Sequence, residues 1–148
     1  MESLRRILQG TIDQLLLEVR RESQNNLEGP SLPENLLSAL HSVFQQSLLH
    51  ALDLVDKNHV MCFVCPAGRE LFQVQASAGN RVYTCLVSSN YCNCPSFVYS
   101  VVLKEDALMC KHLLAVQLGR ALDRVETKDI SGEEFAKLLS ADTETLLA

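Results

Sequence analysis

The chain has 148 residues, of which 47% are hydrophobic, and a formal net charge of −5. That length predicts one compact domain with its own core, and the charge shows no basic stripe of the kind that phosphate contacts require. Strong nucleic-acid binding by this chain alone is therefore disfavoured. No apolar run reaches the roughly eighteen residues of a membrane span, and the start lacks a secretory signal. With six cysteines, we expect an intracellular protein with reduced thiols.

The first predicted element is an amphipathic helix over residues 1–24. Its apolar stripe consists of Leu4, Leu8, Ile12, Leu15 and Val19. Such a stripe usually packs against the protein's own core. Leu17 lies off this stripe and would be costly to expose, so docking of a partner protein is the alternative role for the helix.

A second helix is predicted over residues 32–52, after a breaker segment at residues 25–30. Ser31 and Glu34 have the spacing of a capping box at its start. His41 and His50 both fall on this helix, but they are too far apart to share a metal ion. We therefore interpret both as surface residues or as polar residues with hydrogen-bond partners, and not as metal ligands. These two helices form the predicted N-terminal helical region, residues 1–57.

From residue 59 the hydrophobic period changes to two, which is typical of strands. Short β-rich runs span residues 59–65, 71–76 and 82–87, separated by turn sequences that contain Gly68 and Gly79. They predict a three-stranded antiparallel β-meander. Such a sheet needs a cover for its apolar face, and a helix predicted from Lys111 onward is the natural cover.

Two ligand pairs follow the meander, Cys92-x-Cys94 and Cys110-x-His112. Three thiols and one imidazole are a complete tetrahedral set for one structural zinc ion. Cys92 and Cys94 can reach one ion from a strand end, because alternate residues of a strand share a face. Residues two apart in a helix diverge by about 200°. Cys110 and His112 must therefore straddle a helix start.

Pro95 follows Cys94 directly and predicts a short helix over residues 95–103. Cys94 then precedes the first turn of a helix, where backbone N–H groups favour its thiolate. The helix from Lys111 contains Gly119, which we expect to mark a close approach. The meander and this finger form the second predicted part, residues 58–123.

Three cysteines, Cys62, Cys65 and Cys85, lie outside the predicted zinc set. Cys62 and Cys65 have C-x-x-C spacing, but in a strand they would point to opposite faces. We interpret all three as buried structural thiols. The alternative is a zinc or thiol enzyme that uses them. Because no phosphate loop, nucleophile elbow or acid pair is present, we predict no enzyme activity and no small-molecule substrate.

The last part, residues 124–148, is acidic and is predicted to form a helix and a tail. Ser131 and Glu134 again have capping-box spacing, ahead of Phe135. The predicted fold class is therefore α+β, in one compact domain. It combines N-terminal helices, a three-stranded antiparallel meander and a Cys3His zinc finger with a covering helix.

The pattern of C-x-C, a spacer and C-x-H, with hydrophobic residues after the histidine, resembles the SWIM-type zinc finger. Residues 51–56, 83–86 and 110–116 look like the small SWIM-domain subunit of the Shu complex, and the likeness covers about residues 40–122. It implies a nuclear, non-enzymatic adaptor that pairs with a RecA-like recombinase paralogue. Such adaptors promote recombinase filament assembly on single-stranded DNA during DNA repair by homologous recombination.

Direct DNA binding by the finger is the alternative function. Lys104, Lys111, Arg120 and Arg124 lie close to the predicted zinc ligands in sequence. Its mark would be a steep salt dependence of DNA binding by the protein alone. The resemblance implies instead that contacts with single-stranded DNA are indirect or weak, because the basic surface belongs to the partner.

Overall fold

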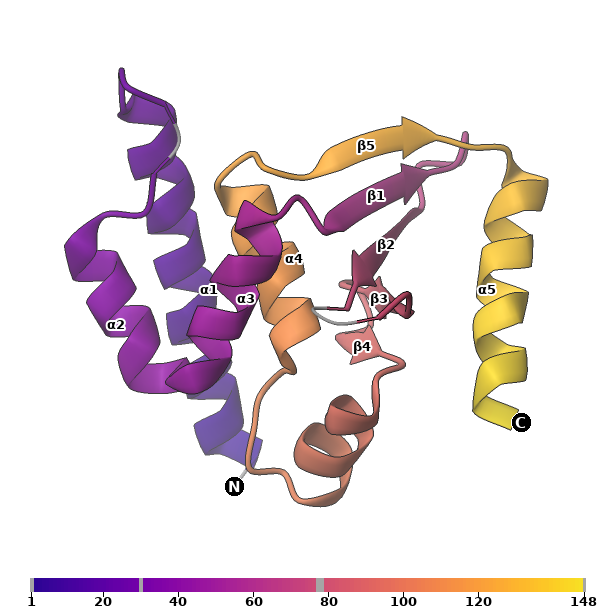
Figure 1. The fold of residues 1–148 in the computed structure, drawn as a ribbon. Helices are drawn as coiled ribbons and strands as arrows, with labels where there is room; N and C mark the ends of the chain where they lie inside the picture. Colours follow the sequence, from indigo (N-terminus) through magenta and orange to yellow (C-terminus); the bar gives the residue numbers. More distant parts are fainter. Residues whose placement is uncertain (1, 30, 77–78, 148) are drawn as a thin grey trace.

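A computed structural model describes residues 2–29, 31–76 and 79–147 (Figure 1). The helices are α1 (Glu2–Asn25), α2 (Glu34–Phe44), α3 (Gln46–Asp56), the π-helix η1 (Phe97–Leu103), α4 (Lys111–Ala121) and α5 (Gly132–Leu147). The strands are β1 (Val60–Val64), β2 (Glu70–Gln75), β3 (Val82–Leu86), β4 (Tyr91–Cys92) and β5 (Glu126–Asp129). None of the helices in these ranges is long and apolar enough to cross a membrane.

The sheet has five strands in the order β4-β3-β2-β1-β5. Strands β1, β2 and β3 form the predicted antiparallel meander, with Phe72 of β2 opposite both Cys62 and Cys85. The sequence prediction missed two strands. One is β4, which has two residues and pairs with β3, and the other is β5, which runs parallel to β1. All four side chains of β5 are exposed, so no apolar alternation marks it as a strand.

Helix α4 covers one face of the sheet, as predicted, and packs in turn against α3 and α1 (Figure 1). It is buried on nearly every side, because Leu113, Leu114, Val116 and Leu118 are all fully inaccessible. Gly119 allows its close packing, since a Cβ there would lie 2.8 Å from the side chain of Val125. The predicted ligand His112 therefore belongs to the central helix of the core.

Helix α5 packs against the opposite face of the sheet. Phe135 of α5 is buried with Leu71, Ile130 and Cys65 in a second, smaller core, against which Phe63 packs. Its start matches the predicted capping, because the backbone N–H of Glu134 donates to Ser131 Oγ at 3.1 Å. The sheet is thus covered on one face by the α4 layer and on the other by α5.

The predicted length of α1 is confirmed, but only part of its apolar stripe packs against the core. Ile12 and Val19 are fully buried, whereas Leu4 is 57% exposed and Leu8 is 37% exposed. Leu17, which lies off the stripe, is 43% exposed. The first two turns of α1 therefore present apolar side chains that the core does not cover.

The prediction of one helix over residues 32–52 is wrong. The helix is interrupted at Gln45, whose φ of 52° lies in the left-handed region. Helices α2 and α3 are therefore separate. The capping box at Ser31 is also wrong, since α2 begins after Pro33 without a side-chain cap. Ser31 Oγ instead accepts a hydrogen bond from Asn26 Nδ2 at 2.7 Å. Apolar periodicity continues through the break, so the pattern alone could not reveal it.

Candidate metal centre

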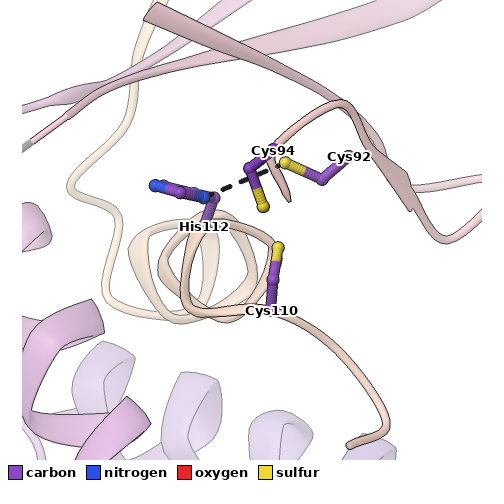
Figure 2. Close-up of side chains that lie close together, drawn as sticks. All are labelled: Cys92, Cys94, Cys110 and His112. Carbon is purple, nitrogen blue, oxygen red and sulfur yellow. Dashed lines mark hydrogen bonds between the residues drawn. The ribbon is translucent and has the colours of Figure 1, made fainter. Parts of the chain in front are cut away.

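The four predicted ligands come together in the structure (Figure 2). The ligand atoms of Cys92, Cys94, Cys110 and His112 all lie within 4.8 Å of one another, and all four residues are buried. Sulfur atoms bound tetrahedrally to zinc at about 2.3 Å are about 3.8 Å apart. The cluster therefore has the size of one tetrahedral site. In the described part of the chain, no other group of three or more His, Cys, Asp and Glu side chains is placed to hold a metal ion.

The first ligand pair comes from the end of strand β4. Cys92 pairs with Cys85 of β3 and is the last residue of its strand. The chain then turns through Asn93, whose Oδ1 accepts from the Thr84 backbone N–H at 2.9 Å. Cys94 precedes a helical turn that begins at Pro95, and the Phe97 N–H donates to its Sγ at 3.3 Å. The predicted contact of this thiol with a helix start is confirmed.

The second ligand pair straddles the start of α4, as predicted. Cys110 is the N-cap residue, with extended backbone (φ −81°, ψ 169°), and its Sγ accepts from the Leu113 N–H at 3.5 Å. His112 is the second residue of the helix. The change from extended to helical backbone lets both side chains point to the same place, which a regular helix would prevent.

The imidazole of His112 is held in one orientation. Its Nδ1 lies 4.0 Å from Cys92 Sγ, and Figure 2 shows the ring edge with this nitrogen turned toward the thiols. The ring of Tyr83, on β3, packs against the imidazole with 4.6 Å between centroids. Tyr83 was not among the predicted site residues, because nothing in its sequence spacing marks it. Nδ1 is therefore the nitrogen positioned for a metal.

The spacer between the two pairs folds into η1 and a short loop. Phe97 and Val101 of η1 are buried in the main core. Arg5 of α1 donates to the backbone oxygens of Val101 at 3.4 Å and Ala107 at 3.2 Å. The predicted helix over residues 95–103 is confirmed in place, with π-helical geometry over most of its length. Helix α1 is thus bonded directly to the loop that the ligands enclose.

The electrostatics of the cluster favour a bound cation. Hydrogen bonds with the Cys110 and Cys92 thiols hold the pKa of Cys94 well below its usual value. Hydrogen bonds with the Cys92 thiol, and then with the Cys94 thiol, raise the pKa of Cys110 well above its usual value. The thiols thus compete for a single negative charge, because a thiolate on one of them disfavours ionisation of the next. A metal ion supplies the positive charge that lets all three ionise.

The other three cysteines are buried, as predicted, but they do not form a second site. Cys62 belongs to the main core and Cys65 to the smaller one, so the two thiols lie on opposite faces of the sheet. Burial, and then the charge of Glu70, raises the pKa of Cys62 to about 11. Such a thiol is a poor nucleophile at neutral pH. Cys85 is fully buried opposite Cys92.

The remaining candidate residues are not members of the ligand cluster. His41 and His50 are exposed, as predicted. Lys104 lies over the ring of Tyr99 and Arg120 over the ring of Phe72, with 4.7 and 5.5 Å to the centroids. Lys111 and Arg120 are about 14 Å apart along α4, from a rise of about 1.5 Å per residue. Lys111 and Arg120 are therefore too far apart to contact one phosphate together.

The chemistry of the cluster is that of a closed structural site. Four protein donors fill a tetrahedron, so no position remains for a water molecule or a substrate. Three sulfur atoms and one imidazole nitrogen suit zinc better than calcium or magnesium, which prefer oxygen. Zinc bound here would join the end of the sheet to the start of its covering helix.

Comparisons with known proteins agree with this geometry. The model of the SWIM zinc finger family matches residues 72–117, which include all four ligand candidates. The chain is similar to zinc finger SWIM domain-containing protein 7 of Danio rerio, with 41% identity over 89% of this chain and 91% of that protein. The Homo sapiens protein of the same name is 35% identical over 90% and 92%. The Dictyostelium discoideum homologue is 30% identical over 86% and 83%. No solved structure matches.

Proposed function

This chain belongs to the family of zinc finger SWIM domain-containing protein 7, and we propose that it is a non-enzymatic, zinc-stabilised adaptor in DNA repair. In this proposal Cys92, Cys94, Cys110 and His112 bind one structural zinc ion. The adaptor is a subunit of a Shu-type complex in the nucleus, pairs with a RecA-like recombinase paralogue and promotes recombinase filament assembly in homologous recombination.

The observation that carries the proposal is the closed ligand cluster between β4 and the start of α4. A zinc ion with four protein ligands has no open position for catalysis, so its contribution is to folding. Apparent binding free energies of about 10–16 kcal/mol for structural zinc exceed the stability of most domains. The ion can therefore decide whether the finger stays docked on the core.

The pairing with a RecA-like paralogue comes from the resemblance to Shu-complex SWIM subunits. Its support in this chain is the charge distribution. The net charge is −5, and Lys104 and Arg120 lie over the rings of Tyr99 and Phe72, so the surface is poorly suited to long phosphate backbones. A paralogue with its own nucleotide and DNA sites would supply the contacts with DNA to which this surface is poorly suited.

The test is to purify the tagged protein from cells and identify co-purifying chains by mass spectrometry. Two variants go beside it. Cys110→Ser removes a predicted ligand, and the matched control Cys65→Ser removes a buried thiol of the second core. The proposal predicts a RecA-like chain with the wild type and the control, and its loss with Cys110→Ser. If the wild type returns alone or with nucleic acid, the adaptor proposal fails and direct DNA binding takes its place.

A further inference from the structure

An exposed apolar surface lies where the first turns of α1 meet the end of η1. On α1 it comprises Leu4, Ile7 and Leu8, which share one side of the helix; Leu4 is 57% and Ile7 66% exposed. On η1 it comprises Val102, 54% exposed, and Leu103, 70% exposed. We call these five residues the α1–η1 surface.

The two halves of this surface are bonded into one unit. Arg5, between Leu4 and Ile7 in α1, donates to the Val101 and Ala107 backbone oxygens on either side of Leu103. Figure 1 shows the start of α1 beside the loop that joins η1 to α4. Between them lies an apolar hollow of about 170 Å³. Its lining residues include Leu4, Leu8, Ala107 and Leu108.

The exposure of η1 is unusual for its sequence. The helix reads FVYSVVL and is apolar except for Ser100 and the Tyr99 hydroxyl, a composition typical of a largely buried helix. Only Phe97 and Val101 are buried, whereas Val98, Tyr99, Val102 and Leu103 are exposed. Contiguous apolar residues on the outside of a soluble domain mark interaction sites more often than chance exposure does.

The rim of the surface carries charges of both signs, since Arg5 lines the hollow and both Arg5 and Arg6 lie beside Val102. Glu105 and Asp106 line the hollow beside Leu4 and Leu8. Glu105 is paired with Arg5 at 3.8 Å, and its φ of 56° is in the left-handed region, which is costly for a residue other than glycine. The Asp106 carboxylate has no ion pair with any described residue. One negative charge at the rim is thus available to a partner.

These features distinguish among possible occupants. A second copy would carry the same net charge of −5, which opposes self-association. A nucleic acid would meet the Glu105 and Asp106 carboxylates and aliphatic side chains that offer no stacking for its bases. The Arg5 guanidinium beside them is already bonded to Glu105 and to two backbone oxygens. An apolar protein segment can fill the hollow, and a Lys or Arg beside it can pair with Asp106 at the rim.

We propose that the α1–η1 surface is the site where the partner protein docks, through a segment with an apolar face and a basic residue opposite Asp106. This inference rests on the proposed function, in which that protein is the RecA-like paralogue. The surface includes the loop between the ligand pairs, so loss of zinc removes the docking site. Zinc dependence of the complex then has a specific structural cause.

The test compares single variants of the full chain, purified from cells with the paralogue quantified by mass spectrometry. Leu103→Glu and Ile7→Glu place a negative charge in the apolar surface. Asp106→Lys reverses the charge of the rim residue that is proposed to pair with the partner. The matched control is Leu27→Glu, an equally apolar and fully exposed residue in the loop after α1. We expect at least a tenfold loss of the paralogue for the first two, a severalfold loss for Asp106→Lys and no change for Leu27→Glu.

Zinc content and thermal unfolding of each variant show whether it is folded. Leu103→Glu is set aside if that variant loses zinc. Recovery of the paralogue with Ile7→Glu and Asp106→Lys, which leave η1 unchanged, then decides the result. Full recovery of the paralogue by folded surface variants overturns the docking site and leaves the adaptor proposal intact. Absence of the paralogue from the wild type overturns both. Loss of a dimer in sedimentation, or of single-stranded DNA binding, in the surface variants alone would show that the proposed occupant is wrong.

Discussion

Cys92 Sγ lies 4.0 Å from Nδ1 of His112, across the gap between the end of β4 and the first turn of α4. That separation is long for a hydrogen bond but suits two ligands of one ion, whose bonds to zinc are about 2.3 Å for sulfur and about 2.0 Å for nitrogen. Cys92 is the last residue of β4, and His112 is the second residue of α4. The metal is thus the expected link between the edge of the sheet and its covering helix.

Substitution of any ligand is expected to remove zinc and destabilise the chain. Cys94→Ser, Cys110→Ser and His112→Ala each leave three donors around a buried site, and we expect a loss of several kcal/mol in the free energy of unfolding. Metal analysis and chemical denaturation measure the two effects. Cys65→Ser, which removes a thiol from the other core, should keep one zinc ion per chain. Unchanged zinc content in all three ligand variants would refute the assignment.

Zinc affinity is expected to fall as the pH is lowered. The raised pKa of Cys110 means that this thiol holds its proton at neutral pH without metal. Zinc binds the thiolate, so binding releases protons and is favoured at higher pH. Competition with a chromophoric chelator between pH 6 and 8, at about 0.15 M salt, measures the slope. An affinity independent of pH would show that the thiols are not the ligands.

Gly119→Ala is expected to destabilise the core. A Cβ at this position would lie 2.8 Å from Val125 Cγ2, so the side chain of Val125 or the backbone that carries it must shift. Overpacking of this kind costs about 1 to 3 kcal/mol. Gly10→Ala is the control, because it lies in α1 with nothing within 4 Å of the new Cβ, and it should gain about 0.5 to 1 kcal/mol. The contrary result, equal effects of the two, would exclude close packing at Gly119.

Arg5→Ala is expected to loosen the loop between η1 and α4. Its guanidinium bonds to the backbone oxygens of Val101 and Ala107, and their loss should cost about 1 kcal/mol. Hydrogen exchange of the Asp106 and Ala107 amides, which bond to the Ser100 oxygen, should quicken. The control Arg21→Ala removes the same side chain from the opposite end of α1. Equal protection of the loop in both variants would contradict the role of Arg5.

The zinc cluster could be predicted from the sequence because its geometry is local. Two-residue spacing in Cys92-x-Cys94 and Cys110-x-His112 fixes which backbone conformations allow both members to reach one ion. The turn after β4 and the N-cap at Cys110 are those conformations. Tyr83 could not be predicted in the same way. It meets His112 only because the sheet places β3 beside α4.

The parts of the fold that pattern alone missed depend on tertiary contacts. Strand β5 has the sequence ETKD, with every side chain exposed, and it is a strand only because β1 offers an unpaired edge. The break at Gln45 interrupts a continuous apolar period, so only the packing of α3 on α4 reveals it. In α1 the periodicity was right, but its first turns extend beyond the core. Sequence periodicity gives the side of a helix that is apolar, not the part of it that is covered.

The most direct test of the central claim, a zinc centre closed by four protein ligands, is X-ray absorption at the zinc edge on the purified protein. The structure predicts three sulfur atoms at about 2.3 Å and one nitrogen at about 2.0 Å, with no further ligand. His112→Ala should remove the nitrogen contribution or the metal itself. A coordination shell that contains a water oxygen, or only two sulfur atoms, would contradict a closed Cys3His centre. It would reopen the possibility of metal-assisted catalysis.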